Sequence, residues 1–281
     1  MKLVSYAQNH EDIILWRALK HVESGCYVDV GANDPVDDSV TKLFYDRGWH
    51  GINIEPSEEY FARLQRDRSR DINLLCAVGA NDGMVVFYEA TTRGWSTSDE
   101  NVGKQYCANA QATSREVPQL CLNTILEQAG RETIHFLKID VEGAEAEVIS
   151  GINFNRFRPW VLLIESLDPI SLKPEFQNWE EEVISGGYVF VFFDGLNRYY
   201  VAKEHAELIQ AFDAPANVLD DFIPFSMMQW TQRAIDAEAT LDLIYASRSW
   251  RITAPLRKLN RGARNLFHCM NRVLQKFGMP R

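Results

Sequence analysis

The stretch from Leu137 to Glu145 (LKIDVEGAE) holds the residues whose types and spacing best suit chemistry. Lys138, Asp140 and Glu142 alternate at the end of a predicted strand, so we expect their side chains to project to one side of it. Burying three charges there costs several kcal/mol unless they are paired or used. A local Lys–Asp ion pair is one interpretation of this pattern, and an active-site cluster is the interpretation that we favour.

Carboxylates also follow most of the other predicted strands. Ligands bind at the carboxyl ends of the strands in an open parallel sheet, so the residues just after each apolar run deserve the closest reading. Those segments are 29–34, 55–56, 77–79, 140–143 and 165–166, and all but the third carry an acid. We therefore expect their carboxylates, including those of Asp29 and Glu165, around one crevice.

Gly31 and Glu55 suggest the kind of ligand that this crevice takes. A glycine after the first strand lets the backbone approach a ligand, but Asn33 and Val36 replace the later glycines of GxGxxG, which disfavours a dinucleotide site. Glu55 lies 24 residues after Gly31, where a carboxylate accepts hydrogen bonds from ribose hydroxyls. Together they indicate a nucleoside-like ligand without a diphosphate. The alternative is a simple turn glycine and a solvated loop acid.

Apolar runs that alternate with helical stretches must position these residues. We predict strands at 26–30, 51–54, 72–78, 134–140 and 161–165. We predict helices at 8–23, 38–47, 57–67, 144–149 and 175–184, the third of them with Ser57 as N-cap. Strands that are apolar on both faces and alternate with helices indicate an α/β fold with a buried, mostly parallel sheet.

Two segments depart from this alternation. Residues 188–193 and 199–201 flank Asp194-Gly-Leu-Asn-Arg198 and predict an antiparallel hairpin, and residues 84–89 form a strand after a tight Asn-Asp-Gly turn. The polar segment 93–117 is expected to be an insertion loop over the site. Within it, Trp95 and Ser96 either contact a substrate or pack on the surface.

Charge is unevenly distributed along the chain. The 281 residues carry 29 bases and 39 acids, a net charge of −10. Nine bases and no acid follow Asp242, which leaves 20 bases against 39 acids, or −19, in residues 1–242. An acidic body is a poor candidate for binding nucleic acid, which needs a basic face.

Other global features point to a cytosolic protein. No apolar run approaches the ~20 residues of a membrane helix, and the N-terminus has no apolar signal region. The five cysteines are scattered without a CxxC pattern, which favours reduced thiols. The histidines form no motif, so His135 is expected to be packed inside a strand and His10 alone lies near the candidate site.

The basic end of the chain predicts an amphipathic helix. From Leu259 to Phe277 apolar residues recur at steps of three and four, with bases between them. Such a helix binds a membrane surface, forms an oligomer contact, or packs on its own acidic body. Residues 247–257 (SRSWRITAPLR) resemble a short segment of bacterial enzymes that build cell-surface polysaccharides.

Four segments together resemble the FkbM family of S-adenosylmethionine-dependent methyltransferases. They are VDVGAN, NIEPSEEYF, NLLCAVGANDG and FLKIDVEGAEAEVISG, and the resemblance covers roughly residues 6–165. It implies a class I methyltransferase fold, a Rossmann-like, mostly parallel seven-stranded sheet with a terminal antiparallel hairpin. We expect this domain in residues 1–225 and a helical, basic, amphipathic extension in residues 226–281.

The resemblance also implies roles for individual residues. Asp140 would be the base or would orient the acceptor, supported by Lys138 and Glu142, with Glu165 as a second candidate. The cofactor would contact residues from five segments: Gln8, Glu11, Asp29, Gly31, Ala32, Asn33, Glu55, Pro56, Ala77, Val78 and Asp140. Asp34-Pro35 after GAN departs from the family pattern, and Pro35 fixes its own φ, so this loop is expected to differ in shape.

The predicted function is S-adenosylmethionine-dependent O-methylation of a sugar hydroxyl in bacterial cell-surface polysaccharide synthesis. The acceptor would be a nucleotide sugar or a lipid-linked glycan, and the protein would be cytoplasmic, held peripherally at the inner membrane through residues 247–281. No HxxxH or similar spacing predicts metal ligands, so no metal site is assigned, although carboxylates could hold a divalent cation. A nicotinamide-dependent oxidoreductase and a non-catalytic assembly module of a polysaccharide-synthesis complex are the alternatives.

Overall fold

The centre of the fold is a sheet of seven strands. In spatial order these are β10 (Tyr188–Phe193), β11 (Asn197–Ala202), β9 (Val161–Glu165), β8 (Phe136–Ile139), β2 (Cys26–Val30), β3 (His50–Ile54) and β4 (Ile72–Leu74). The five strands from β9 to β4 pair in parallel, whereas β11 is antiparallel to both of its neighbours. The predicted α/β fold is thus confirmed, and β10 and β11 form the predicted hairpin.

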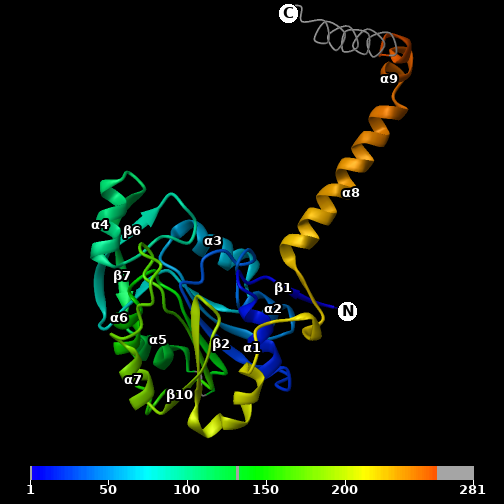
Figure 1. The fold of residues 1–281 in the computed structure, drawn as a ribbon. Helices are drawn as coiled ribbons and strands as arrows, with labels where there is room; N and C mark the ends of the chain where they lie inside the picture. Colours follow the sequence, from blue (N-terminus) through cyan, green and yellow to red (C-terminus); the bar gives the residue numbers. More distant parts are fainter. Residues whose placement is uncertain (1, 131–132, 258–281) are drawn as a thin grey trace, which may run out of the picture. The chain divides into compact units, whose positions relative to one another are not determined.

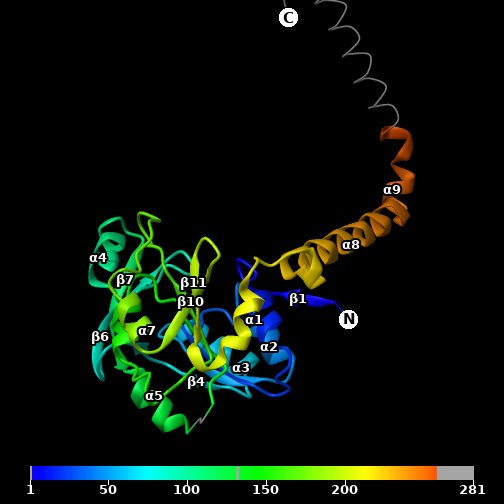
Figure 2. The same cartoon turned by 60° about the horizontal axis from the view of Figure 1, so that its bottom comes forward.

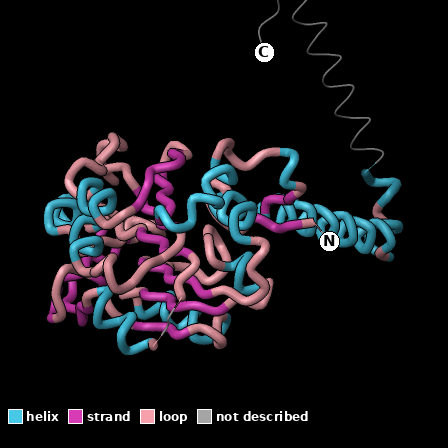
Figure 3. Tube along the Cα trace, turned by 90° about the horizontal axis from the view of Figure 1, so that it is seen from below, coloured by secondary structure: helices cyan, strands magenta, loops and turns pink. Residues whose placement is uncertain are grey.

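The computed structural model describes residues 2–130 and 133–257. They belong to two compact units, a first that ends at Phe225 and a second that begins at Ser226. In the first unit the strands run between layers of helices and loops (Figure 3). Its helices are α1 (Glu11–Leu19), α2 (Lys42–Asp46), α3 (Glu58–Asp67), α4 (Glu100–Ala108), α5 (Leu122–Ala129), α6 (Glu145–Ser150), α7 (Glu180–Ser185) and two 3₁₀ segments, η1 (Lys203–Phe212) and η2 (Val218–Asp220).

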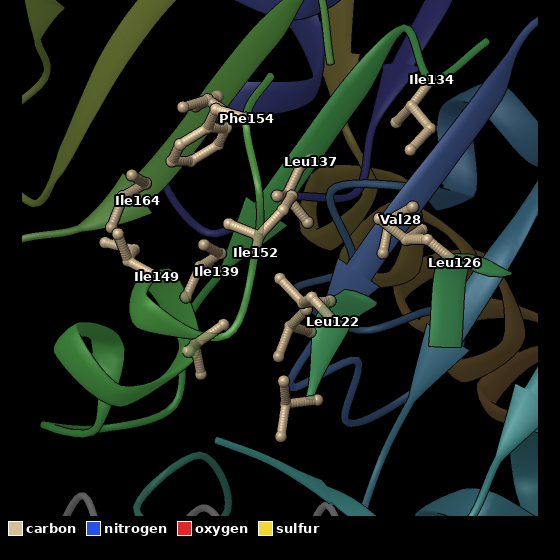
Figure 4. Close-up of a cluster of buried hydrophobic side chains, with 14 of the residues drawn as sticks. Val28, Leu122, Leu126, Ile134, Leu137, Ile139, Ile149, Ile152, Phe154 and Ile164 are labelled. Atoms are coloured by element: carbon tan, nitrogen blue, oxygen red, sulfur yellow. The ribbon is translucent and has the colours of Figure 1, made fainter. Parts of the chain in front are cut away.

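Each face of the sheet has its own apolar core, because successive side chains of a strand point to opposite faces. Val28 of β2 packs on the face covered by α5, α6 and α7, together with Leu122 and Ile149 (Figure 4). Tyr27 packs on the other face, with α1, α2 and η1. Figure 2 shows α5 and α7 on the side opposite α1 and α2. Every residue of β2 is buried, as expected for a strand covered on both faces.

Two smaller sheets flank the main one. β5 (Ala77–Val78), β7 (Ala112–Leu120) and β6 (Gly83–Ala90) form a three-stranded sheet next to α4 (Figure 1), and β1 (Leu3–Ser5) pairs in parallel with β12 (Phe222–Pro224). The single strand predicted at 72–78 is wrong, because β4 and β5 belong to different sheets. The insertion loop predicted at 93–117 is wrong in part, because it contains α4 and most of β7.

Several predicted helix bounds are too wide, for local backbone reasons. The first helix starts only at Glu11, because His10 has a φ of 63°. The second is reduced to α2: Asp38, the first residue of the predicted helix, has a φ of 62° and forms a β-bridge with Ala7, and the helix starts only at Lys42. Ser57 precedes α3 as predicted, but its hydroxyl makes no cap bond and donates instead to Glu89 Oε1 at 2.6 Å.

The second unit begins within a long helix. α8 (Phe225–Ala246) has no buried residue, and α9 (Arg248–Ile252) follows, capped by the Ser247 hydroxyl, which accepts from the Trp250 N–H. No helix in the described part of the chain is both long and apolar enough to cross a membrane. The predicted amphipathic stripe from 259 to 277 lies outside the described residues.

Candidate active site

A cavity of about 490 Å³ opens at the carboxyl ends of β2, β3, β8 and β9. Its wall includes every residue that the sequence singled out for catalysis or cofactor binding: Gln8, Glu11, Asp29, Gly31, Ala32, Asn33, Glu55, Pro56, Ala77, Val78, Lys138, Asp140, Glu142 and Glu165. Parallel strands share one carboxyl edge, which is why strand-end residues as far apart in the sequence as Asp29 and Glu165 meet here. The cavity size is typical of small-molecule sites.

Gly31 forms a bare backbone turn at the end of β2. Its φ is +75°, and a Cβ at this position would lie 1.9 Å from the carbonyl oxygen of Asp140. The N–H groups of Gly31 and Ala32 donate to Ile54 O at 3.0 and 3.2 Å, which ties the turn to β3. Only glycine fits this position. Because glycine has no side chain, the backbone of the turn is accessible to a ligand in the cavity.

Glu55 is a buried carboxylate at the end of β3. It accepts from the Asn33 N–H at 2.8 Å and from the Ser57 N–H at 2.7 Å. Burial raises the pKa of Glu55 to about 7, and the two backbone donors oppose that shift. In its ionised form the carboxylate has acceptor sites left for two neighbouring hydroxyls, the requirement for binding a ribose diol.

Lys138 holds two carboxylates and a carbonyl at the centre of the site. Its Nζ lies 3.2 Å from Asp29 Oδ1 and 3.2 Å from Asp140 Oδ2, and it donates to Gly31 O at 2.7 Å. Burial alone lowers the pKa of this ammonium, but Asp140 and Asp29 raise it above its ordinary value, so Lys138 is charged. Thr41 Oγ1 donates to the other oxygen of Asp29 at 2.9 Å. The lysine thereby neutralises a deeply buried aspartate and orients one that lines the cavity.

A second acidic group lies beside this ion-pair network. One carboxylate oxygen each of Asp140, Glu142 and Glu165 lies within 4.8 Å of the others. Burial and the neighbouring acids raise the pKa of Glu142 to about 9 and that of Glu165 well above its ordinary value. Within the described residues Glu165 Oε2 is buried with no hydrogen-bond partner. This donor set can share protons or hold a hard divalent cation.

Glu142 reaches the cluster by a route that differs from the prediction. β8 ends at Ile139, so the alternation expected from Lys138 to Glu142 does not continue. The chain turns instead, with Glu142 at a φ of 57° and Gly143 at 104°, and Thr97 Oγ1 donates to Glu142 O at 2.8 Å. A non-glycine residue held in this left-handed region marks local strain at the site. Both interpretations of this segment describe part of the geometry: Lys138 and Asp140 form a local ion pair, and Asp140 and Glu142 belong to a cluster of acids.

The N-terminal segment contributes Gln8 and Glu11 to the wall. Glu11 is buried, accepts from the Asn9 N–H at 2.8 Å and from Asn197 Nδ2 at 2.9 Å, and has its pKa raised by burial to about 8. His10 is outside the cavity wall, and its ring lies 4.8 Å from that of Phe222. His135 is packed, as predicted: its Nδ1 accepts from the Cys26 N–H at 3.0 Å.

Among the wall residues that were not predicted from the sequence, two groups lie beside the end of β9. Leu196 and Asn197 reach the wall because β11 runs antiparallel, which pairs its first residue, Asn197, with the last residue of β9, Glu165. The loop after β9 contributes Asp168, Pro169 and Leu172. These residues follow the strand end at Glu165, so a longer window after each predicted strand would have included them. No local sequence signal identifies Leu196 and Asn197 as residues of the cavity wall.

The insertion covers one side of the cavity. Trp95 and Ser96, predicted there, line it together with Arg93, Thr97 and Phe87, which were not predicted. The Trp95 ring stacks on Tyr106 with centroids 5.8 Å apart and planes at 20°, and the residue remains 43% exposed. The substrate-contact and surface-packing interpretations of Trp95 are therefore compatible, since one ring face packs and the residue still borders the cavity.

A carboxylate-lined cavity at the carboxyl edge of a largely parallel sheet is the arrangement of an α/β enzyme that binds its ligand across the strand ends. The family model described as Methyltransferase FkbM domain matches residues 29–190, from β2 into β10. The chain therefore belongs to the FkbM methyltransferase family. All of the predicted site residues except Gln8 and Glu11 lie in the matched range. A search of curated proteins found no match.

Proposed function

We propose that this methyltransferase uses S-adenosylmethionine to methylate a hydroxyl oxygen of a sugar. The observation that carries the proposal is the placement of Glu55 and the Lys138–Asp140 pair in one cavity, with the bare Gly31 turn between them. The strand order and the antiparallel β11 support a class I methyltransferase fold of Rossmann-like type. Family membership supports the reaction type.

The residues present fit this cofactor. Gly31 provides the cradle that a Cβ would fill, and Glu55 would hold the ribose hydroxyls. The buried apolar pair Ala77 and Val78 would edge the adenine. Asp29 and Asn33, with Ala32, Pro56, Gln8 and Glu11, would line the rest of the cofactor. When bound, the cofactor supplies a methyl group on a positively charged sulfonium, which a cavity rich in carboxylates favours.

Asp140 is the residue best placed to take the hydroxyl proton of the acceptor. It borders the cavity with its side chain 36% exposed, and the Lys138 ammonium 3.2 Å away fixes its orientation. Burial and the neighbouring acids raise the pKa of Glu142 to about 9, so it retains its proton at neutral pH, and they raise the pKa of Glu165 well above its ordinary value. Both side chains would orient the acceptor by hydrogen bonding. Positioning the acceptor can supply several kcal/mol of the barrier, and a positioned base adds about 10²–10⁴-fold.

A neutral polyhydroxylated acceptor suits the rest of the wall. The acid groups beside Asp140 place several oxygen atoms at the reacting end of the cavity, and these oxygens form hydrogen bonds with hydroxyl groups. Trp95 borders the same cavity as an aromatic surface. The segment 247–257 supports a role in bacterial cell-surface polysaccharide synthesis, with the protein in the cytoplasm and peripheral to the inner membrane.

Transfer of a labelled methyl group from S-adenosylmethionine to a panel of nucleotide sugars and lipid-linked glycans tests the proposal. We expect base-stable label on the sugar of at least one acceptor, lost in Asp140→Asn. Binding of cofactor without transfer to any acceptor would favour the non-catalytic assembly module, and reduction of NAD by the same panel would favour an oxidoreductase.

Flotation of anionic liposomes with the full chain and with residues 247–281 removed tests the membrane assignment; equal flotation contradicts it.

A further inference from the structure

α8 carries an apolar seam that is exposed within the described part of the second unit. The seam, which we define as Met227, Trp230, Ala234, Ala237, Leu241 and Ile244, recurs at steps of three and four residues. Met227 and Trp230 are 61% and 67% exposed, and Leu241 and Ile244 are 46% and 43% exposed. This is the a/d spacing of a coiled coil, sustained over three heptads.

The seam is distinct from the other faces of the helix. The charged residues of α8, Arg233, Asp236, Glu238 and Asp242, all fall outside it. The neighbouring stripe starts at Met228 and has the same spacing, but it includes Glu238 and Asp242. This stripe cannot be buried along its whole length, because burying the two carboxylates is unfavourable. The seam is therefore a face of α8 with a/d spacing and no charged residue, although Met228, Ile235 and Leu243 place further exposed apolar side chains outside it.

Burial of an apolar face would also stabilise α8 as a helix. It is 22 residues long with no buried residue, and it contains Thr231, Thr240, Trp230 and Ile235, which are weak helix formers. Most helices in proteins gain much of their stability by burying an apolar face. The seam is the face that α8 offers for burial.

We propose that α8 pairs with α8 of a second copy of this chain as a parallel two-stranded coiled coil. With Met227 at an a position, Arg233 falls at g and Glu238 at e of the next heptad. In a parallel pair g faces e of the partner five residues further on, so two Arg233–Glu238 ion pairs flank the seam. In an antiparallel pair g faces g and e faces e, so neither Arg233–Glu238 ion pair can form. Ala234 and Ala237 let the helices approach closely at the centre, and the larger seam residues fill the layers on either side.

Two exposed leucines that lie two residues apart allow dimerisation through the seam to be tested in the full chain, one as the test position and the other as its control. Leu241 lies in the seam, and Leu243, 74% exposed, lies outside it. Sedimentation equilibrium should show a dimer for the native chain. Leu241→Asp should raise the dimer dissociation constant by about 100-fold or more, because a carboxylate enters the seam, whereas Leu243→Asp should change it by less than about threefold. A native chain that is monomeric at about 100 μM, or two variants with equal effect, would overturn the proposal.

Charge reversal tests the parallel register. Arg233→Glu and Glu238→Arg should each weaken the dimer by about fivefold, because each sets like charges across the seam, and the double variant should regain most of the native affinity. Loss in the double variant equal to the sum of the single losses would overturn the parallel arrangement. Near-native thermal unfolding of the first unit in every variant shows that the chain has folded.

Discussion

The Lys138 ammonium lies 3.2 Å from the Asp140 carboxylate and, at the same distance, from that of Asp29. It joins the ends of β2 and β8, because Asp29 lies on β2 and Lys138 on β8. Asp29 is 1% exposed, whereas the Asp140 side chain is 36% exposed and borders the cavity. The same ammonium thus serves the stability of the sheet through one carboxylate and the chemistry of the cavity through the other.

Asp140→Asn should lower the rate of methyl transfer about 10²–10⁴-fold, because the amide keeps the shape of the side chain but cannot take a proton. The affinity for S-adenosylhomocysteine should change by less than about threefold, since asparagine keeps the size and one acceptor oxygen of the side chain that borders the cofactor. Single-turnover transfer of labelled methyl, with calorimetry on the same protein, checks both. Full turnover with intact cofactor binding would exclude Asp140 as the base.

Lys138→Met should destabilise the protein by about 3–5 kcal/mol, because it leaves the carboxylate of Asp29 buried without its cation. The exposed pair Lys104–Glu100 supplies the control, with side chains 66% and 70% exposed. Lys104→Met should cost less than about 1 kcal/mol. Urea unfolding of the two variants measures the difference, and similar losses would mean that Lys138 does not compensate a buried charge.

Gly31→Ala should destabilise the protein by about 3 kcal/mol, because the new Cβ adds a clash with Asp140 O to the strain of a positive φ. Gly48 separates the two effects, since its φ is +91° and nothing lies within 4 Å of its Cβ position. Gly48→Ala should cost about 1–2 kcal/mol from strain alone and leave cofactor affinity unchanged. Equal unfolding curves for both variants would rule out the close approach of Gly31 to Asp140.

The pH dependence of cofactor affinity should follow the ionisation of Glu55. Its pKa of about 7 lies above the ordinary value, so the free protein carries the protonated acid below neutrality and the hydroxyl-accepting carboxylate above it. Affinity for S-adenosylhomocysteine should therefore rise as pH increases, by up to about tenfold per unit below pH 7, and level off above it. Glu55→Gln should bind weakly and lose this part of the pH profile. An unchanged profile in the variant would assign it to another acid, such as Glu11 or Glu145, whose pKa values are raised by burial into the same range.

The rule that parallel strands share a carboxyl edge was sufficient to bring together the strand-end residues Gly31, Glu55 and Asp140. Gln8 and Glu11 lie at no strand end and were predicted only from the family resemblance. The mutual distances in the acidic cluster could not be predicted, because Glu142 arrives through a left-handed turn and Glu165 from another strand. The strand β7 was missed because its apolar periodicity is weak, and it pairs with β6 along its whole length through backbone hydrogen bonds.

Calorimetric titration of the native chain with S-adenosylhomocysteine and, separately, with NAD tests the central claim most directly. We predict micromolar binding of S-adenosylhomocysteine, weakened by Glu55→Gln, and at least about 100-fold weaker binding of NAD, because the turn at Gly31 lacks the later glycines that make room for a diphosphate. Tighter binding of NAD, or binding of neither compound, would contradict the assignment of this cavity to S-adenosylmethionine.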